Sequence, residues 1–246
     1  MSSQAQQEAL LNDVALSLGA LREAKIRFGD RFAPDFNLFD YLRSDEIGLS
    51  NCIAGLLDPK GSHGQGGALL NAFLTRIGRP DMIGSRQDWE VTTEKQANGM
   101  RRIDIFLRSN MAIIGIENKP WAGDQLKQLS DYASYLRGEA GNCKWLLIYL
   151  SDREPPTNSI DSTERTELMR DGQFLQCSYV DLISWLEECA GKTRAPTVRL
   201  FIEELAKFVR TRIRGELDMS EEKETTAAIL KSKQNLEAAF DVARAL

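Results

Sequence analysis

Two acids and a lysine between residues 101 and 128 have the types and the spacing of a metal-dependent catalytic site. Asp104 lies in a segment of alternating aliphatic residues, and Glu117 and Lys119 are two positions apart at the end of a later apolar run. Two carboxylates at about 4 Å repel by about 1 kcal/mol in water and by about 4 kcal/mol at an effective dielectric constant of 20. If Asp104 and Glu117 converge, they therefore need a compensating cation.

The chemistry of these residues favours a hard divalent cation. A ligand set of carboxylates, a carbonyl and waters suits Mg²⁺ or Mn²⁺ better than Zn²⁺. Such an ion activates a water molecule and offsets the charge that develops on a phosphate under attack. Lys119 would orient that nucleophile or contact the phosphate as a point charge. We therefore predict a metal-dependent phosphodiesterase in which Asp104, Glu117 and the backbone carbonyl of Asn118 bind the cation.

Two predicted strands position these residues. Ile103, Ile105 and Leu107 alternate with more polar or aromatic positions, so a strand through them sends Asp104 to the face opposite the aliphatic side chains. After a short turn, the apolar run over 111–116 predicts a second and more buried strand.

The second strand ends in Glu117-Asn118-Lys119. A period of two places the Glu and Lys side chains on one face, about 7 Å apart along the backbone, and the Asn side chain on the other. Pro120 follows, and because proline donates no ladder hydrogen bond it ends the strand. The acid and the base thus stand at the open end of a strand, where open α/β sheets place their sites. The bare motif also fits a solvated charge pair on an exposed strand.

The order Asp104, then Glu117-x-Lys119, resembles the core of the PD-(D/E)XK, or restriction-endonuclease-like, nuclease superfamily. Further segments resemble one bacterial branch of it, over roughly residues 40–190 and in that family's order. They are the segment from Ser44 to Phe73 with a loop of the form L-L-D-P-x-G-x-H-G-x-G, then Arg102-Ile-Asp-Ile and Ile116-Glu-Asn-Lys, and a helix with Asp124, Gln125, Gln128, Leu129 and Tyr132.

In nucleases of this kind a glutamate on the first core helix often joins the metal site, and Glu46 is the matching position. Local sequence alone explains Glu46 equally well as an acid in the first turn of a helix that Ser44 or Asp45 caps, where the helix dipole favours negative charge. With the family-like loop that follows, we interpret Glu46 as a metal ligand. Glu94, in a strand predicted over 88–96, is another candidate contributor to the site, but we favour its interpretation as a surface charge.

A helix predicted over about 122–137 supplies polar groups next to the acids. Gln125, Gln128 and Tyr132 are three and four positions apart, so they share one helical face. The resemblance implies that a glutamine and a tyrosine near these positions line the site, and we assign Gln128 a catalytic role and Gln125 and Tyr132 a substrate-binding role. The alternative is a helix whose polar residues face water.

His63 is the chain's single histidine. Zinc sites built from several histidines are therefore excluded, and the cysteines at 52, 143, 177 and 189 lack the close pairs of a zinc ribbon. The glycine-rich loop around His63 lacks the Gly-Lys-Ser/Thr ending of a nucleotide-binding P-loop. We place His63 near the cleft as a substrate-binding residue, without a role in proton transfer.

Composition predicts a cytoplasmic enzyme. The 246 residues, 42% of them hydrophobic, can bury one elaborated α/β domain. The polar start resembles no signal peptide, and no apolar run reaches membrane-spanning length. The net charge of −5 argues against indiscriminate coating of nucleic acid but not against a nuclease. The basic residues nearest the acids in sequence are Arg101, Arg102, Arg108 and Lys127, of which we expect Arg108 and Lys127 to be simply solvated.

The remaining elements follow from apolar spacing. Helices are predicted over about 5–28, 44–57, 198–212 and 220–246, and strands over 102–108, 112–119, 144–150 and 174–180, the last followed by a helix that Asp181 caps. The loop from Ser151 to about Asp171 is expected to be mobile. The chain ends inside its last helical pattern, which leaves room for a continuation, an oligomer or a partner at this helix.

The sequence therefore predicts an α/β fold, with a restriction-endonuclease-like core, a mixed central sheet flanked by helices, and extra helices at both termini. We expect a single domain over 1–246, with its core at about 40–190 and a helical extension at about 196–246. The predicted function is Mg²⁺- or Mn²⁺-dependent hydrolysis of nucleic acid, with DNA favoured over RNA by the resemblance. The alternative is an inactive nuclease fold that binds nucleic acid or protein.

Overall fold

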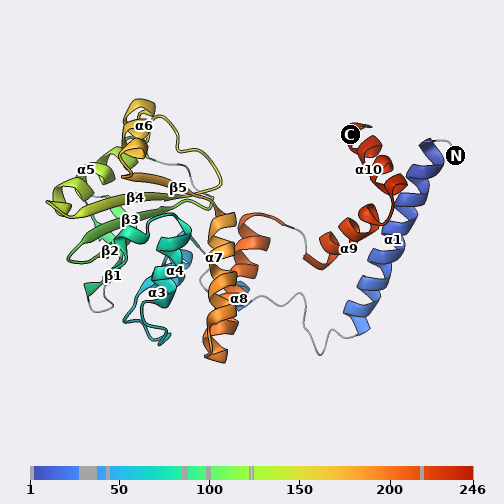
Figure 1. Cartoon of the computed structure of the whole chain (residues 1–246), viewed down its shortest axis with the longest axis horizontal. Helices are drawn as coiled ribbons and strands as arrows, with labels where there is room; N and C mark the ends of the chain where they lie inside the picture. Colours follow the sequence, from blue (N-terminus) through green and yellow to red (C-terminus); the bar gives the residue numbers. More distant parts are fainter. Residues whose placement is uncertain are drawn as a thin grey trace. The chain divides into compact units, whose positions relative to one another are not determined.

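The computed structural model describes residues 3–27, 38–42, 45–84, 88–97, 101–121, 123, 125–216 and 219–245. Contacts divide the chain into two compact units (Figure 1). The larger unit is Asn37–Arg214, and the smaller combines Met1–Phe36 with Gly215–Leu246. This division differs from the single domain that the sequence predicted, because the two ends of the chain pack with each other.

The larger unit is built on a five-stranded mixed sheet with the order β1-β2-β3-β4-β5. β2 is antiparallel to both β1 and β3, and β4 is parallel to both β3 and β5. The strands are β1 Glu90–Gln96, β2 Arg102–Arg108, β3 Ala112–Asn118, β4 Lys144–Leu150 and β5 Phe174–Cys177. The predicted α/β fold with a mixed central sheet is confirmed. β3 is buried along its whole length, as its continuous apolar run predicts for a strand covered on both faces.

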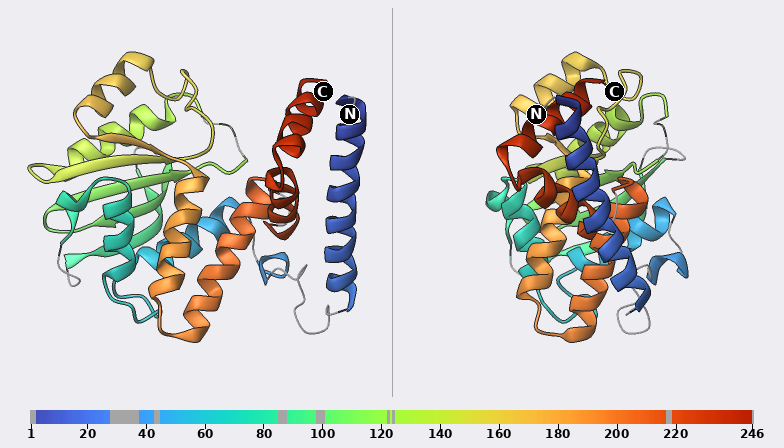
Figure 2. Two further views of the ribbon diagram at one scale, coloured as in Figure 1. Left: turned by 45° about the vertical axis from the view of Figure 1, so that its right-hand side comes forward. Right: turned by 90° about the vertical axis from the view of Figure 1, so that its right-hand side faces the viewer.

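Helices cover both faces of this sheet (Figures 1 and 2). One apolar cluster joins β2, β3 and β4 to α3, α4, α7 and α8, and the other joins the opposite sheet face to α5 and α6. The helices are α3 Glu46–Leu57, α4 Ala68–Arg76, α5 Gln128–Ala140, α6 Ser162–Arg170, α7 Tyr179–Lys192 and α8 Pro196–Phe208, with short helical turns at Leu38–Asp40 and Pro80–Met82 and a π-helical turn at Val209–Ile213.

Gly115 lets α5 lie close against the middle of β3. A Cβ atom at this position would stand 3.0 Å from Leu136 Cδ1 and 3.4 Å from Ile103 Cγ2, so a larger residue would force the Leu136 side chain to shift. Close contact between α5 and β3 is what brings polar groups of the first turn of α5 to the end of the strand.

α5 begins later than predicted, at Gln128 instead of about residue 122. Asp124, which the sequence placed on this helix, lies outside the described residues. The first turn is held by a segment that was expected to be a mobile loop: the buried Ser159 accepts a hydrogen bond from Leu129 N–H at 3.2 Å with its hydroxyl and one from Ser130 N–H at 3.2 Å with its carbonyl. These contacts satisfy two N–H groups that the helix itself cannot. The same segment, from Ser151 to Asp171, contains α6.

The helix after β5 also begins differently from the prediction. β5 ends at Cys177, and Ser178 caps α7 in a reciprocal capping box with Asp181, so Ser178 is the cap in place of Asp181. Asp45 caps α3 by accepting from Gly48 N–H at 2.8 Å, while Ser44, the other predicted cap, lies outside the described residues.

The smaller unit consists of α1 Ser3–Arg27, α9 Met219–Leu230 and α10 Lys233–Ala245. α1 packs against both other helices. The single helix predicted over 220–246 is thus broken in two, because Ser232 Oγ accepts from Asn235 N–H at 3.1 Å and starts a new helix. The extension predicted from about residue 196 is divided as well, since α8 belongs to the core of the larger unit. Of the helices described, none has the length and apolar content needed to cross a membrane.

Candidate active site

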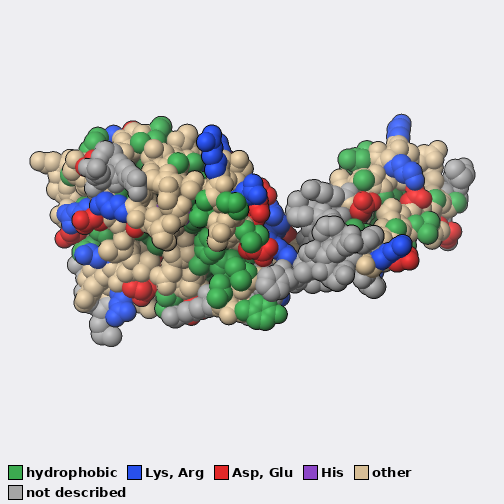
Figure 3. All heavy atoms as spheres, turned by 90° about the horizontal axis from the view of Figure 1, so that it is seen from below, with side chains coloured by type: hydrophobic (Ala, Val, Ile, Leu, Met, Phe, Trp, Pro, Cys, Tyr) green, Lys and Arg blue, Asp and Glu red, His purple; other side chains and the backbone are tan. Residues whose placement is uncertain are grey.

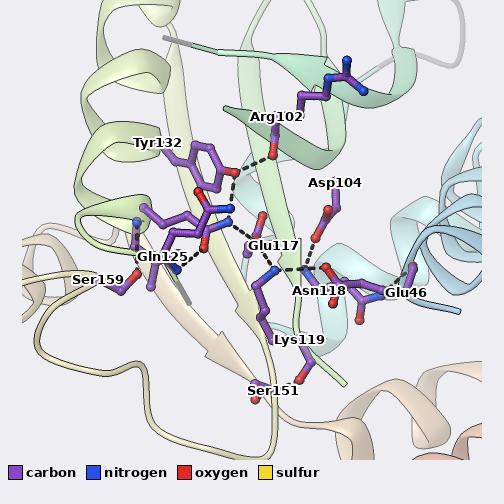
Figure 4. Close-up of polar contacts among 12 residues, drawn as sticks. Glu46, Arg102, Asp104, Glu117, Asn118, Lys119, Gln125, Tyr132, Ser151 and Ser159 are labelled. Carbon is purple, nitrogen blue, oxygen red and sulfur yellow. Dashed lines mark hydrogen bonds and ion pairs between the residues drawn. The ribbon is translucent and has the colours of Figure 1, made fainter. Parts of the chain in front are cut away.

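A cleft of about 350 Å³ opens at the end of β3. Its walls come from the start of α3, from β1, β2 and β3, and from the start of α5; the lining residues are Glu46, Ile47, Glu94, Arg101, Arg102, Asp104, Glu117, Lys119, Gln125, Gln128 and Tyr132. The structure thus brings Asp104, Glu117 and Lys119 into one cleft, as predicted. Figure 4 shows these side chains with the contacts between them.

Asp104 enters the site through a break in the β2–β3 ladder. The backbone pairing of these strands runs only as far as Ile105 and Ile116, and beyond it Asn118 N–H donates to Asp104 Oδ2 at 2.7 Å. The sequence predicted that Ile103 and Ile105 share one face of β2. This prediction is wrong, because Ile105 packs in the cluster on the α3 side and Ile103 in the cluster on the α5 side. The carboxylate takes the hydrogen bond that a strand carbonyl would otherwise accept.

The pKa of Asp104 is raised from 3.8 to about 6. Burial is the largest cause, and the negative charges of Glu46 and Glu94 act in the same direction. The hydrogen bond from Asn118 and the charge of Lys119 lower the pKa, but they do not compensate for burial. Burial therefore disfavours the ionised form of Asp104 more than its hydrogen bond and Lys119 favour it.

Glu117 is fully buried and uses one of its two oxygens for all its contacts. Oε1 is 2.6 Å from Lys119 Nζ and accepts from Gln128 Nε2 at 2.6 Å. Oε2 is buried without a hydrogen-bond partner among the described residues. Burial and the charge of Asp104 raise the pKa of Glu117 well above its ordinary value. An unpaired buried carboxylate oxygen costs free energy unless something else binds it.

Lys119 connects two acids from different elements. Nζ is 3.0 Å from Glu46 Oε1 as well as 2.6 Å from Glu117 Oε1. Burial lowers the pKa of Lys119, but the nearby charge of Glu117 and the hydrogen bonds outweigh it and raise the pKa overall. Lys119 N–H also donates to Leu150 O at 2.9 Å, so its backbone continues the pairing of β3 with β4. The strand period of two then places its side chain on the same sheet face as that of Glu117.

Glu46 projects from the first turn of α3, as predicted, but its partner is Lys119. In the part of the chain that the structure describes, no group of three or more His, Cys, Asp or Glu side chains is close enough to hold a metal ion. The predicted ligand set of Glu46, Asp104, Glu117 and Asn118 is therefore not assembled as a cluster, because the ammonium group stands between Glu46 and Glu117.

Gln128 fixes Glu117 from the side of α5. Its Nε2 donates to Glu117 Oε1 and, at 3.1 Å, to Tyr132 Oη, while its Oε1 accepts from Gln125 N–H at 3.0 Å. The Tyr132 hydroxyl donates in turn to Arg102 O. Gln125 lines the cleft but precedes the helix, so the predicted shared helical face holds for Gln128 and Tyr132 alone.

His63 does not reach this cleft, which corrects its predicted position. Its Nδ1 accepts from Gln65 N–H at 3.0 Å, so Nε2 carries the proton and donates to Asp58 O at 2.8 Å. The ring lines a separate apolar cavity of about 560 Å³ beside Gly55 and Leu56, in the last turn of α3. Glu46 opens the same helix nine residues before Gly55, about 14 Å along its axis.

The basic residues lie as expected except for Arg108, which forms an ion pair where simple solvation was expected. Arg101 and Arg102 line the cleft, and Arg102 Nη1 lies 3.6 Å from Glu94 Oε2. Arg108 pairs with Glu139 at 3.0 Å on the exposed surface, and Lys127 is exposed.

The sequence analysis undervalued Glu94 as a residue of the cleft and missed Ser50 and Tyr179 behind it. Glu94 lines the cleft, although it was interpreted as a surface charge; it lies between the pairs Thr93–Ile105 and Lys95–Ile103, which makes it the β1 neighbour of Asp104. The pairing of β1 with β2 as an antiparallel hairpin could have placed Glu94 beside Asp104 from the sequence. Ser50 and Tyr179 contact Asn118 on the sheet face opposite the cleft. Only Ser50 could have been predicted from local sequence, because it lies one helical turn after Glu46.

The fold and the cleft define a class of protein: a mixed sheet of restriction-endonuclease-like type with an acid on one strand and an acid-x-lysine triplet on the next. A family model described as the PD-(D/E)XK nuclease superfamily matches residues 36–207, and the chain belongs to this superfamily. Its members are usually nucleases and generally use divalent metals. The matched residues coincide closely with the larger unit, Asn37–Arg214. Searches of curated proteins and of solved structures gave no match.

Proposed function

We propose that this protein is a divalent-cation-dependent nuclease that hydrolyses phosphodiester bonds of nucleic acid, with DNA as the favoured substrate. One observation carries the proposal. Asp104, Glu117 and Lys119 line one cleft, and in that cleft Glu117 presents a buried oxygen that no described residue satisfies. The preference for DNA rests on the family resemblance alone.

The donor atoms of the cleft fit a hard cation. Glu117 Oε2 has no partner among the described residues, and burial raises the pKa of the Asp104 carboxylate despite the charge of Lys119. We propose these two carboxylates and the Asn118 carbonyl as ligands for Mg²⁺ or Mn²⁺, with waters completing the set. When bound, the cation would activate a water molecule and neutralise charge on the phosphate.

Lys119 is suited to act on the phosphate or the nucleophile. An ammonium group has three N–H donors, and two of them face Glu117 and Glu46. Among the described residues the third donor has no carboxylate partner, and we propose that it serves a group in the cleft. Because the two carboxylates fix the direction of the side chain, the remaining donor is oriented before substrate arrives, which is the condition for stabilising charge in a transition state.

Gln128 and Tyr132 support the site without touching the substrate. Both N–H donors of the Gln128 amide are used, on Glu117 and on Tyr132, and the Tyr132 proton is used on Arg102 O. The catalytic role predicted for Gln128 is therefore better described as positioning of Glu117. Arg101 and Arg102 at the cleft wall are the better candidates for contact with the phosphate backbone.

A second reading, an inactive nuclease fold that binds nucleic acid or protein, is favoured by one observation. Among the described residues no three acids converge, and Lys119 separates Glu46 from Glu117. Metal binding without cleavage would support this reading.

The deciding experiment is a cleavage assay with the full chain on linear, circular, single-stranded and branched DNA and on RNA. Each substrate is incubated with Mg²⁺, Mn²⁺ or EDTA, and Asp104→Asn serves as the inactive control. We expect cleavage with either cation, none with EDTA and little with the variant. If no substrate is cut under any of these conditions, the nuclease proposal fails.

A further inference from the structure

The side chain of Asn118 connects three elements behind the cleft. It is fully buried and lies on the sheet face opposite Glu117. Its Nδ2 donates to Ser50 Oγ at 3.0 Å and to Glu46 O at 3.4 Å, both on α3, and its Oδ1 accepts from Tyr179 Oη at 2.6 Å on α7. Since Glu46 O only accepts hydrogen bonds, it must face the amide nitrogen, and the carboxamide orientation is fixed.

The same residue holds Asp104 through its backbone. Asn118 N–H donates to Asp104 Oδ2 at 2.7 Å, beyond the end of the β2–β3 ladder. A shift or rotation of Asn118 therefore displaces two acids of the cleft at once: Asp104 through the N–H group, and Glu46 through the first turn of its helix.

Tyr179 is placed to prevent that movement. It is the first residue of α7, directly after the Ser178 cap, and its N–H donates to Asp152 Oδ1 at 2.8 Å. Its buried hydroxyl donates to Asn118 Oδ1 at 2.6 Å, and burial raises the pKa of the phenol above its ordinary value. Tyr179 thus presents a fixed hydrogen-bond donor to Asn118 Oδ1.

We propose that Tyr179 is a positioning residue of the active site: through Asn118 it sets the positions of Asp104 and of the α3 turn that carries Glu46. This inference rests on the proposed nuclease function. Tyr179 is behind the sheet and is not among the residues that line the cleft, so it does not meet substrate or cation itself. Its contribution is the geometry of the carboxylates.

A purely structural role predicts a different outcome from a positioning role. Loss of a hydroxyl that only stabilises the fold would lower the urea midpoint and leave the folded enzyme unchanged. Loss of a positioning contact lowers both the affinity for the cation and kcat. KM for nucleic acid stays constant, because the arginines in the wall of the cleft are unchanged. Substitution of a residue that contacts a metal ligand from behind typically lowers metal affinity or activity by about 10- to 100-fold.

The test compares Tyr179→Phe with Tyr135→Phe, a matched loss of a hydroxyl on α5 away from the cleft. Mn²⁺ affinity is measured by titration calorimetry on the full chain, in the absence of nucleic acid, beside kcat, KM and the urea midpoint. We expect Tyr179→Phe to weaken Mn²⁺ binding and kcat at least tenfold with KM unchanged, and Tyr135→Phe to match the parent. Equal Mn²⁺ affinity and kcat in Tyr179→Phe and the parent would overturn the proposal.

Ser50→Ala provides a second route to the same conclusion if Tyr179→Phe does not fold. It removes the acceptor of Asn118 Nδ2 on α3 and should weaken Mn²⁺ binding in the same direction. If it binds Mn²⁺ like the parent, the positioning role is rejected. A parent protein that binds no Mn²⁺ and cuts nothing refutes the proposed function instead, so the two failures are distinguishable.

Discussion

Lys119 Nζ lies 2.6 Å from Glu117 Oε1, and both side chains leave the same face of the end of β3. The contact satisfies only one carboxylate oxygen, because Glu117 Oε2 has no partner among the described residues. If Lys119 only neutralised the charge of Glu117, its ammonium group could contact both carboxylate oxygens. Here the ammonium is shared with Glu46, and one face of the Glu117 carboxylate is left for a ligand.

Lys119→Met should separate binding from chemistry. The substitution keeps an apolar stem of similar length and removes the ammonium, so the carboxylates remain while charge stabilisation is lost. We expect turnover to fall by about 10²- to 10³-fold, the usual cost of removing one donor that stabilises a transition state. Mn²⁺ binding, measured by calorimetry, should persist. Lys127→Met, at an exposed lysine, is the control; loss of metal binding in Lys119→Met alone would contradict the assignment.

The raised pKa of Asp104 predicts a pH dependence of stability in the metal-free protein. A carboxyl whose folded pKa is about 6 instead of 3.8 binds its proton more tightly when folded. Its contribution is therefore fully present below about pH 4 and is lost as the pH rises through about 6. A shift of about two units corresponds to about 3 kcal/mol at most.

Urea unfolding in EDTA at several pH values measures this contribution. The parent should lose stability between about pH 4 and pH 6 relative to Asp104→Asn, which carries no titrating group there. Asp171→Asn, at an exposed acid after α6, is the control and should follow the parent. Mn²⁺ affinity of the parent should rise over the same interval, since the ligand must lose its proton. Parallel curves for the parent and Asp104→Asn would rule out the raised pKa.

Gln128→Ala should loosen Glu117 without unfolding the protein. It removes a donor at 2.6 Å from Glu117 Oε1, and a buried hydrogen bond of this kind stabilises the fold by about 1–3 kcal/mol when one partner is charged. We expect metal affinity or turnover to fall by about 10- to 100-fold. Gln125→Ala is the matched control, because Gln125 contributes its backbone N–H to the network and its side chain is exposed. Equal effects of both substitutions on metal affinity would argue against positioning by Gln128.

Sequence patterns could predict the parts of this site that depend on local periodicity. The buried run before Glu117 predicted β3, and the period of two predicted that Glu117 and Lys119 share a face. The family resemblance added Gln128 and also Glu46, which is distant in sequence from Glu117. For Glu46 a local signal was present, because Asp45 caps the start of α3, whereas the start of α5 at Gln128 is held by the distant Ser159.

The rest depends on tertiary contacts that leave no local pattern. The alternation around Asp104 gave no sign that its carboxylate would replace a ladder carbonyl. Tyr179 is separated from Asn118 by 61 positions, and nothing at either residue predicts the contact. His63 was misplaced because a glycine-rich loop with a histidine resembles a binding loop, whereas both ring nitrogens are used within the loop itself.

Glu94→Gln tests whether the acid on β1 competes with substrate for Arg102. Glu94 has φ of 53°, an uncommon backbone conformation for a non-glycine residue, and its carboxylate lies 3.6 Å from Arg102 Nη1 in the cleft wall. The Arg102 side chain is 63% exposed, so the pair is weak, about 1 kcal/mol or less. Removing the charge frees Arg102 for a phosphate and removes one negative charge beside Asp104.

We expect Glu94→Gln to lower KM for nucleic acid by up to about fivefold, which corresponds to about 1 kcal/mol, and to make binding more sensitive to salt. Mn²⁺ affinity should change little. Glu154→Gln is the control, because Glu154 also pairs with an arginine, Arg165, but lies outside the cleft. If Glu94→Gln instead weakens Mn²⁺ binding as strongly as Asp104→Asn does, then Glu94 belongs to the cation site and not to the substrate-binding wall. In that case the positive φ at Glu94 would serve to turn a third carboxylate toward Asp104.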